Sequence, residues 1–287
     1  MYTYAWYHWL TFFYVYCFFG WIFESTYVSL KQRHFVNRGF LRLPMLPLYG
    51  TGAVMMLWVS LPVRNSLIAV YFSGVIGATI LEYITGWAME RLFKVRYWDY
   101  SNQKFNLHGY ICLSSSIAWG FLTILMTEVI HPPIAKAVLD IKPHTEWFFL
   151  ITTTILFGYD TFHSTKEALD LARALESITK LRAELEDMQV QIALLRAQTV
   201  QEIHRIKENV RDSVVESAEL HHETISLKRE EFEEKIQELS KQLNEKRSLL
   251  KTRIGKRTPE ILRRNPGAIS SRFASALKEL RSTLENL

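Results

Sequence analysis

The 287-residue chain combines two halves of opposite character, which its average composition conceals. All eight Trp and all 13 Tyr lie before residue 164, together with only 11 of the 34 Lys and Arg, whereas the remainder has 23 Lys and Arg against 21 Asp and Glu. The mean hydropathy near zero therefore sums an apolar, membrane-like half and a charged, helical half. The net charge of +5 is modest, and it argues for a membrane protein with basic loops on one side before it argues for nucleic-acid binding.

The two cysteines, Cys17 and Cys112, fall inside apolar segments, and their spacing indicates neither a metal site nor a disulfide. The N-terminus has no basic n-region and no small-residue cleavage site, so we expect no cleaved signal peptide. We also expect no cofactor.

Five apolar segments precede residue 164, and a bilayer core needs about 20 mostly apolar residues per helix. The last segment is shorter and weaker, so it is either a fifth span or a re-entrant or interfacial segment. The expected spans of this transmembrane domain, residues 1–163, are 5–23, 44–61, 67–89, 109–130 and 147–162.

The loops after the first and third expected spans are basic, and basic loops stay in the cytoplasm. The first loop has Lys31, Arg33, Arg38 and Arg42, and the third has Arg91, Lys94, Arg96 and Lys104. This asymmetry predicts a plasma-membrane protein with its N-terminus outside. Five spans also place the highly charged second half in the cytoplasm, whereas four spans would place it outside.

The transmembrane domain contains an internal repeat. Gly20-Trp21-Ile22-Phe23-Glu24 closes the first span, and Gly86-Trp87-Ala88-Met89-Glu90 closes the third. A basic loop, an asparagine (Asn37 or Asn106) and a glycine follow each in the same order. The pattern predicts two parallel helix pairs plus a fifth span, an arrangement with which transporters build a site between two halves. Chance recurrence of residues common at helix ends is the alternative.

Glu82 is the most informative single residue, because it lies inside the third span. An ionised carboxylate there costs about 2.5 kcal/mol or more, so it should face a partner, the bundle interior or a water-filled cavity. An ion, proton or substrate site is one interpretation, and an interhelical salt bridge is the other.

We expect the other polar residues near the cytoplasmic ends of the spans to surround that site. The candidates are Glu24, Glu82, Glu90, Asn37, Arg38, Arg96, Trp98, Asp99, Asn106 and His108. Each also has a structural interpretation: the asparagines as helix caps, the aromatic residues as interfacial anchors and His108 as an interfacial hydrogen-bonding group.

Six short motifs together resemble one known family. They are Gly20-Trp21-x-x-Glu24, Asn37-Arg38-Gly39-Phe40-Leu41, Pro47-Leu48-Tyr49-Gly50, Leu81-Glu82-Tyr83, Trp98-Asp99-Tyr100-Ser101 and Phe105-Asn106-Leu107 with Gly109. Over about residues 10–125 the chain resembles the ABC-transporter type IV (CmpB-like) family of bacterial multi-pass membrane proteins. The resemblance implies a permease-like protein, and it carries neither a substrate nor a catalytic residue.

The sequence gives no sign of a nucleotide-hydrolysing enzyme. A Walker A motif requires Gly-x-x-x-x-Gly-Lys-Ser/Thr, and the nearest string, Gly255-Lys256-Arg257-Thr258, has Arg after Lys and lacks the first Gly. No feature demands a separate ATPase subunit. An intramembrane enzyme using Glu82 or His108 lacks any supporting catalytic motif.

Residues 164–252 predict a cytoplasmic coiled coil. The segment from Ser164 to Lys251 has no Gly or Pro, and apolar residues recur at spacings of three and four with one stutter. The pattern weakens between Val210 and Phe232, so either one continuous rod or a helix hairpin would fit. The seam predicts a homo-oligomer or a partner helix.

Residues 253–287 predict a basic linker and a last amphipathic helix, with anionic lipid or the coiled coil as its partner. The apolar side of that helix comprises Ile269, Phe273, Leu277, Leu280 and Leu284. The whole chain is thus expected to be all-α: a polytopic bundle in the lipid bilayer, followed by a coiled coil. The functional interpretation is a permease-like protein with a cytoplasm-facing polar site, and the alternative is a membrane-anchored scaffold that acts through its coiled coil.

Overall fold

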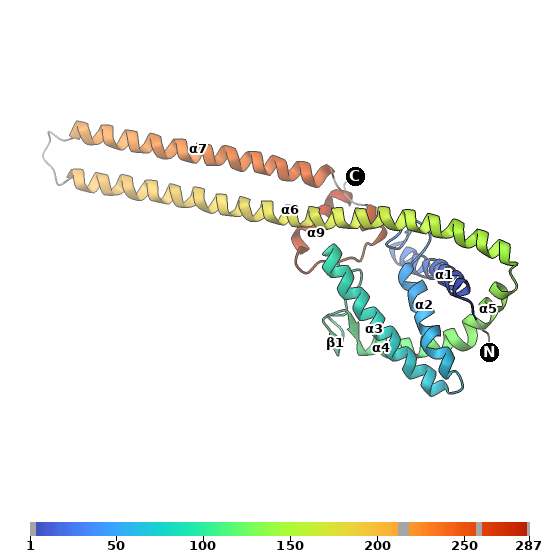
Figure 1. Ribbon diagram of the computed structural model, residues 1–287. Helices are drawn as coiled ribbons and strands as arrows, with labels where there is room; N and C mark the ends of the chain where they lie inside the picture. Colours follow the sequence, from blue (N-terminus) through green and yellow to red (C-terminus); the bar gives the residue numbers. More distant parts are fainter. Residues whose placement is uncertain (1–3, 212–217, 257–259, 286–287) are drawn as a thin grey trace. The chain divides into compact units, whose positions relative to one another are not determined.

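A computed structural model describes residues 4–211, 218–256 and 260–285 (Figure 1). It is 80% helical, which confirms the prediction of an almost all-α protein. The main helices are α1 (Trp6–Gln32), α2 (Pro47–Ser60), α3 (Leu67–Phe93), α4 (Leu113–Leu125), α5 (His131–Leu139), α6 (Pro143–Arg211), α7 (Ala218–Lys256), α8 (Glu260–Arg264) and α9 (Ala274–Glu285). The minor elements are a 3-10 turn η1 (Leu61–Val63), a π turn η2 (Met126–Ile130) and the antiparallel strands β1 (Asn106–Leu107) and β2 (Ile111–Cys112).

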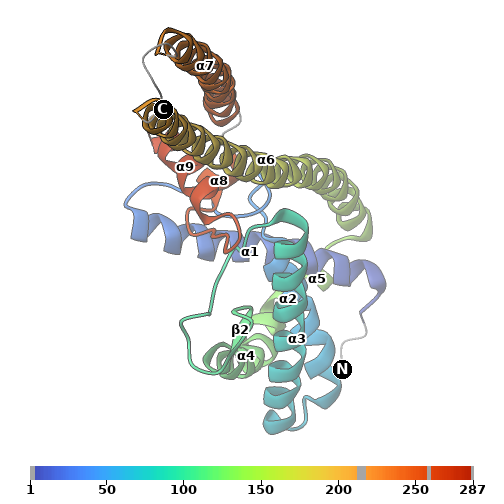
Figure 2. The ribbon, with the colours of Figure 1, turned by 90° about the vertical axis from the view of Figure 1, so that its left-hand side faces the viewer.

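The chain forms two compact units. Unit 1 comprises Met1–Arg173 and Pro259–Leu277, and unit 2 comprises Ala174–Thr258 and Lys278–Leu287. The first unit thus contains the predicted transmembrane domain together with part of the tail. Figure 2 shows this tail segment, in red, near the blue loop that follows α1.

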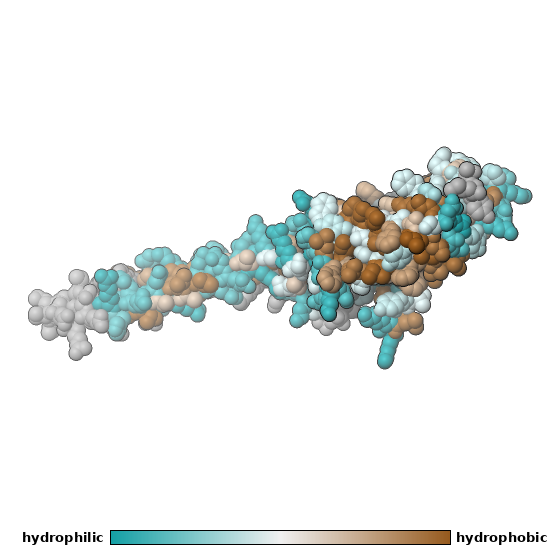
Figure 3. Space-filling view, turned by 90° about the horizontal axis from the view of Figure 1, so that it is seen from below, coloured by the Kyte–Doolittle hydropathy of each residue, from teal (hydrophilic) through white to brown (hydrophobic). Residues whose placement is uncertain are grey.

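Two helical stretches of unit 1, Leu67–Phe93 and Leu113–Leu139, are long and apolar enough to cross a membrane, and Pro47–Val63 is a shorter apolar stretch. Only 22% of either apolar window is buried, whereas the core helix of a soluble protein is mostly covered. On α3 the exposed residues follow one ridge at intervals of four: Ile68, Phe72, Ile76, Ile80 and Ile84. Figure 3 shows apolar side chains gathered over the face of unit 1 that it presents.

Helix boundaries follow local chemistry. Pro47 starts α2 at a position where a missing N–H costs nothing, and the Ser66 side chain caps α3 by accepting from the Ala69 N–H. The fourth apolar helix continues to Leu139, past the expected end at 130. A π turn, η2, directly precedes the adjacent prolines 132 and 133, which have no N–H to donate to the preceding turn.

The core of unit 1 joins the helices of both repeats. α1 packs against α2, and α3 packs against α4. A buried cluster then connects the pairs and α5: Phe12, Tyr16, Ala53, Met56, Leu57, Ala78, Met126, Ala135 and Val138. This core holds fixed the helix ends that carry the candidate residues.

In unit 2, the part of α6 from Ala174 lies beside α7, which runs back in the opposite direction (Figure 1). Leu185, Met188 and Leu243 form a small buried cluster between the two helices, and the Lys246 ammonium pairs with Glu184 at 2.6 Å. Of the two alternatives, the structure therefore has the hairpin and not the rod. Its turn, residues 212–217, and the seam side chains at positions 206 and 210 lie outside the described residues.

The tail differs from its prediction. The last helix, α9, begins only at Ala274, so Ile269 and Phe273 precede it and the expected five-residue apolar stripe on one helix is wrong. Residues 269 and 96 instead form an antiparallel β-bridge. The side chain of Leu284 lies outside the described part of the tail.

Candidate functional site

In the first repeat, a tyrosine and an arginine converge on Glu24, which lies about two turns before the end of α1. The Tyr49 hydroxyl donates to the Glu24 carboxylate at 2.7 Å, and Nε of Arg38 lies 3.4 Å from its other oxygen. Gly20, one helical turn before Glu24, makes room for this tyrosine, because a Cβ there would lie 2.3 Å from the Cβ of Tyr49. On one face of α1, Gly20 thus leaves space for the Tyr49 ring and Glu24 accepts a hydrogen bond from its hydroxyl.

The second repeat places the same residue types around Glu90. The Tyr110 hydroxyl and Nε of Arg96 both donate to Glu90 Oε2, the latter at 2.7 Å. Gly86 faces the ring of Tyr110, which would lie 3.1 Å from an added Cβ. The Arg96 guanidinium also stacks 4.9 Å from the centre of that ring. Both Gly-Trp-x-x-Glu motifs therefore form a glycine–tyrosine–glutamate–arginine cluster.

Asp99 extends the second cluster. One carboxylate oxygen accepts from the Ser101 hydroxyl at 2.6 Å, from the Ser101 N–H at 3.1 Å and from Nη1 of Arg96 at 3.4 Å. Burial raises the pKa of Asp99, but the hydrogen bonds from Ser101 and the charge of Arg96 together lower it below its ordinary value. Asp99 thus remains an anion that fixes the position of Arg96.

Glu82 lies apart from both ion pairs, in a buried and neutral environment. It is only 7% exposed, and it accepts from Nε1 of Trp119 at 2.9 Å. The Tyr100 hydroxyl donates at 3.1 Å and the Ser115 hydroxyl at 3.3 Å. Among the ion pairs of the described residues, none involves Glu82. The carboxylate is thus held by three uncharged donors from α4 and the loop before β1.

Tyr100 holds Glu82 from the loop before β1. Its hydroxyl donates to Glu82, and Glu24 lies close enough to act on it electrostatically. Burial, followed by the charge of Glu82, raises the pKa of Tyr100 above its ordinary value, so the phenol stays protonated and can donate. Tyr100 thus donates a hydrogen bond to Glu82, and the charge of Glu24 also raises its pKa.

The two candidate asparagines bind loops and do not cap helices. Asn37 accepts from Nε1 of Trp21 at 2.6 Å and donates to the Arg42 carbonyl at 2.8 Å. Asn106 donates to the Gln103 carbonyl at 2.8 Å. Since α2 and α4 have Leu46 and Cys112 at their N-caps, the capping interpretation is wrong for both asparagines.

Trp98 and His108 lie around the second cluster. Nε1 of Trp98 donates to the Tyr110 carbonyl at 3.0 Å, which holds Tyr110 toward Glu90. His108 has a left-handed backbone, with a φ of 55°, and its exposed ring lies 3.2 Å from the Tyr83 hydroxyl. Neither residue contacts Glu82.

Several buried polar groups escaped prediction from the sequence. Glu146 is 2% exposed and accepts from the Thr11 hydroxyl at 2.7 Å, while both ring nitrogens of His131 bond tyrosine hydroxyls, at Tyr4 and Tyr16. Asn265 of the tail is also buried. For Glu146 and His131 the only sequence signal is a polar residue in or beside an apolar run, whereas Asn265 has none. Each of the three has a partner more than a hundred residues away.

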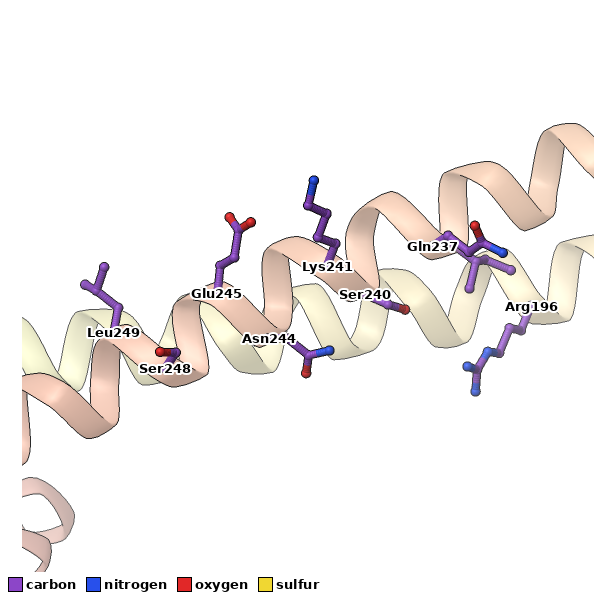
Figure 4. A pocket seen from close by; sticks show the side chains of 9 residues that line it. Arg196, Gln237, Ser240, Lys241, Asn244, Glu245, Ser248 and Leu249 are labelled. Carbon is purple, nitrogen blue, oxygen red and sulfur yellow. The ribbon is translucent and has the colours of Figure 1, made fainter.

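Two surface grooves lie away from Glu82. One of about 960 Å³ in unit 2 is lined by one residue of α6 and eight of α7, and its labelled side chains point in different directions instead of converging (Figure 4). A second, of about 610 Å³, runs along the end of α1 from Trp21 to Phe35. Among the described residues, no group of three or more His, Cys, Asp and Glu is placed to hold a metal ion.

A comparison with protein-family models matches residues 11–165 to a family described as Putative ABC-transporter type IV. This match covers more than half of the chain. Neither the curated proteins nor the solved structures contain a match.

Proposed function

This chain belongs to the ABC-transporter type IV family, and from that premise we propose that it is a permease-like, multi-pass membrane protein. Family membership and two apolar helices of membrane-spanning length indicate a membrane protein. We propose further that the helical segments at residues 5–23, 44–61 and 147–162 also cross the bilayer. The basic loops would then face the cytoplasm of a bacterial cell, with the N-terminus outside.

The burial of Glu82 among neutral donors is the observation that carries the proposal. A carboxylate that only fastened helices together would be expected to meet a cation, yet Trp119, Tyr100 and Ser115 are its hydrogen-bonding partners. Such a group can accept a proton or bind a cationic solute without first breaking a salt bridge. The two glutamate–arginine clusters, one per repeat, would form the cytoplasm-facing part of the site.

We propose that the chain is a carrier and not an enzyme. No part of the site combines a nucleophile, a base and an activating group, and the described residues include no metal-binding cluster. We propose that the hairpin of α6 and α7 packs as a coiled coil and supplies the contact with a second copy or with a partner helix. The basic tail would face anionic lipid.

The test is charge movement in proteoliposomes that contain the full-length protein. Solid-supported-membrane recording with a panel of cationic, anionic and zwitterionic solutes, at two pH values, should detect a current for at least one class. Glu82→Gln should abolish that current. Glu128→Gln is the matched control, because Glu128 is a partly exposed carboxylate paired with Arg64 at 3.0 Å. A current that Glu82→Gln leaves unchanged would refute the proposed site.

A membrane-anchored scaffold is the second candidate, and the hairpin favours it. One continuous helix, α6, carries the chain from unit 1 into unit 2. If internal deletion of residues 176–250 removes the cellular phenotype while Glu82→Gln preserves it, the scaffold is the better account.

A further inference from the structure

The tail segment 260–273, called the strap below, lies against the loops of both repeats. It begins with α8 and ends just before α9. Its apolar side chains at Ile261, Leu262, Ala268 and Phe273 are each at most 5% exposed. The strap is therefore packed into unit 1 as firmly as a core element, although its sequence is that of a basic linker.

At the first repeat, Asn265 of the strap hydrogen-bonds to Arg38 and to the backbone next to it. Its side-chain oxygen accepts from Nη1 of Arg38, the arginine that also pairs with Glu24. Its amide group donates to the Gly39 carbonyl at 3.0 Å. Asn265 is 2% exposed and the Arg38 side chain is 14% exposed, so little of this arginine is open to solutes while the strap is in place.

At the second repeat, the strap pairs with the segment around Arg96. The backbone of Ile269 exchanges both hydrogen bonds with that of Arg96, at 2.7 and 2.9 Å. The Ser270 hydroxyl donates to the Lys94 carbonyl at 2.7 Å, and the Ser271 hydroxyl donates to Glu90 Oε1 at 3.3 Å. Glu90 Oε1 is the oxygen that Arg96 and Tyr110 leave free, since both of them bond Oε2.

The strap is anchored at its start by α6. Glu167 accepts from the Ile261 N–H at 2.6 Å and from Nη2 of Arg264 at 2.8 Å. The same carboxylate also pairs with Arg42 at 3.2 Å. A single residue of α6 thereby ties the strap to the first basic loop.

We propose that the strap is an autoinhibitory latch on the site proposed above. The inference rests on that proposed function, because it names what regulates access to the same residues. Asn265 presents an acceptor to Arg38, and Ser271 presents a donor to Glu90. A polar solute with a carbonyl or carboxylate oxygen and a donor group would bind at the same two positions. The strap must leave both ion pairs before such a solute can reach them.

Chemical access to Arg38 tests the latch without any transport measurement. The full-length protein in nanodiscs is treated with phenylglyoxal, which modifies guanidinium groups, and modification of Arg38 is followed by mass spectrometry with exposed Arg91 as the internal reference. The double variant Asn265→Ala/Ser271→Ala should raise the rate at Arg38 at least about tenfold, because three hydrogen bonds that hold the strap are lost. Ser282→Ala is the matched control, since its hydroxyl bonds only within α9.

A disulfide provides the opposite perturbation. Residues 95 and 270 flank the bridged pair 96 and 269 on facing segments, and such neighbours have a Cα separation that a disulfide can span. In Val95→Cys/Ser270→Cys, oxidation should slow modification of Arg38 and reduction should restore the rate. Thiol labelling of buried Cys17 reports whether each variant remains folded.

The latch is overturned if the Arg38 rate stays within about twofold of the wild type in the double alanine variant, or if it is equal in the oxidised and reduced forms of the double cysteine variant. Labelling measures access and not flux. Unchanged labelling therefore refutes the latch and leaves the proposed function standing. A current unaffected by Glu82→Gln refutes the proposed site, and with it the autoinhibitory role, while the labelling result still reports whether the strap covers Arg38.

Discussion

Gly20 is the position at which the repeated cluster is most sensitive to a single methyl group. In Gly20→Ala the new Cβ would lie 2.3 Å from the Cβ and 2.4 Å from the Cγ of Tyr49. The Cβ of Tyr49 is bonded directly to the main chain of α2, and its Cγ is one bond further, so a rotamer change cannot remove the clash. Helices α1 and α2 must therefore move apart. Overpacking of this kind costs about 3 kcal/mol, and the better helix propensity of alanine returns about 1 kcal/mol.

The net effect is a loss of about 2 kcal/mol in the free energy of unfolding, which corresponds to a fall in Tm of roughly 4–8 °C. Gly52→Ala is the control, because nothing lies within 4 Å of a Cβ built there and only the propensity gain remains. Its Tm should rise slightly. Both variants are measured by tryptophan fluorescence during heating in the same detergent. If Gly20→Ala is as stable as Gly52→Ala, the close approach of Tyr49 to α1 is wrong.

Three further predictions concern stability. Phe12→Ala should lower the free energy of unfolding by about 3–5 kcal/mol, because this ring is fully buried. Ile76→Ala should lower it far less in the same thermal assay, because the Ile76 side chain is 60% exposed. The pKa of Asp99 is lower in the folded protein than in the unfolded chain, so its stabilising contribution is complete above the ordinary aspartate pKa and is lost as the pH falls through the folded value. In Asp99→Asn the Tm should therefore fall less steeply with decreasing pH than in the wild type. An unchanged slope would contradict this. Lys246→Gln should lower the thermal stability of the hairpin only slightly, with a smaller effect at high salt, because the pair with Glu184 is exposed to solvent. An equal loss at low and high salt would count against this.

The sequence predicted those parts of the structure that depend on local pattern. Apolar runs marked the helices, and the order Gly-Trp-x-x-Glu marked two equivalent helix ends. The basic loop just after Glu24 made Arg38 a reasonable partner, and the ion pair forms between residues only 14 positions apart. Local pattern was less reliable for the fourth span, which was expected to end at residue 130 but continues through a π turn and past Pro132 and Pro133 to Leu139.

The contacts that complete the site depend on how distant segments fold together. Asn265 is 227 residues from Arg38, and nothing in its neighbourhood distinguishes it from an exposed linker residue. The three donors to Glu82 likewise come from a loop and from the next helix, so the periodicity of α3 carries no information about them. Hydrophobic pattern determines which faces are buried, whereas polar partners are selected only after the helices have packed.

The duplicated helix pair has also diverged in one decisive place. The spacing of 66 residues that relates Glu24 to Glu90 places Tyr16 opposite Glu82. Tyr16 is buried like its counterpart, but it is a phenol bonded to His131, whereas Glu82 is a carboxylate. At equivalent heights the two helix pairs therefore hold different chemistry, an ionisable carboxylate in one and a buried phenol in the other. Exchanging the two residue types between these positions would move the charge to the opposite half of the bundle.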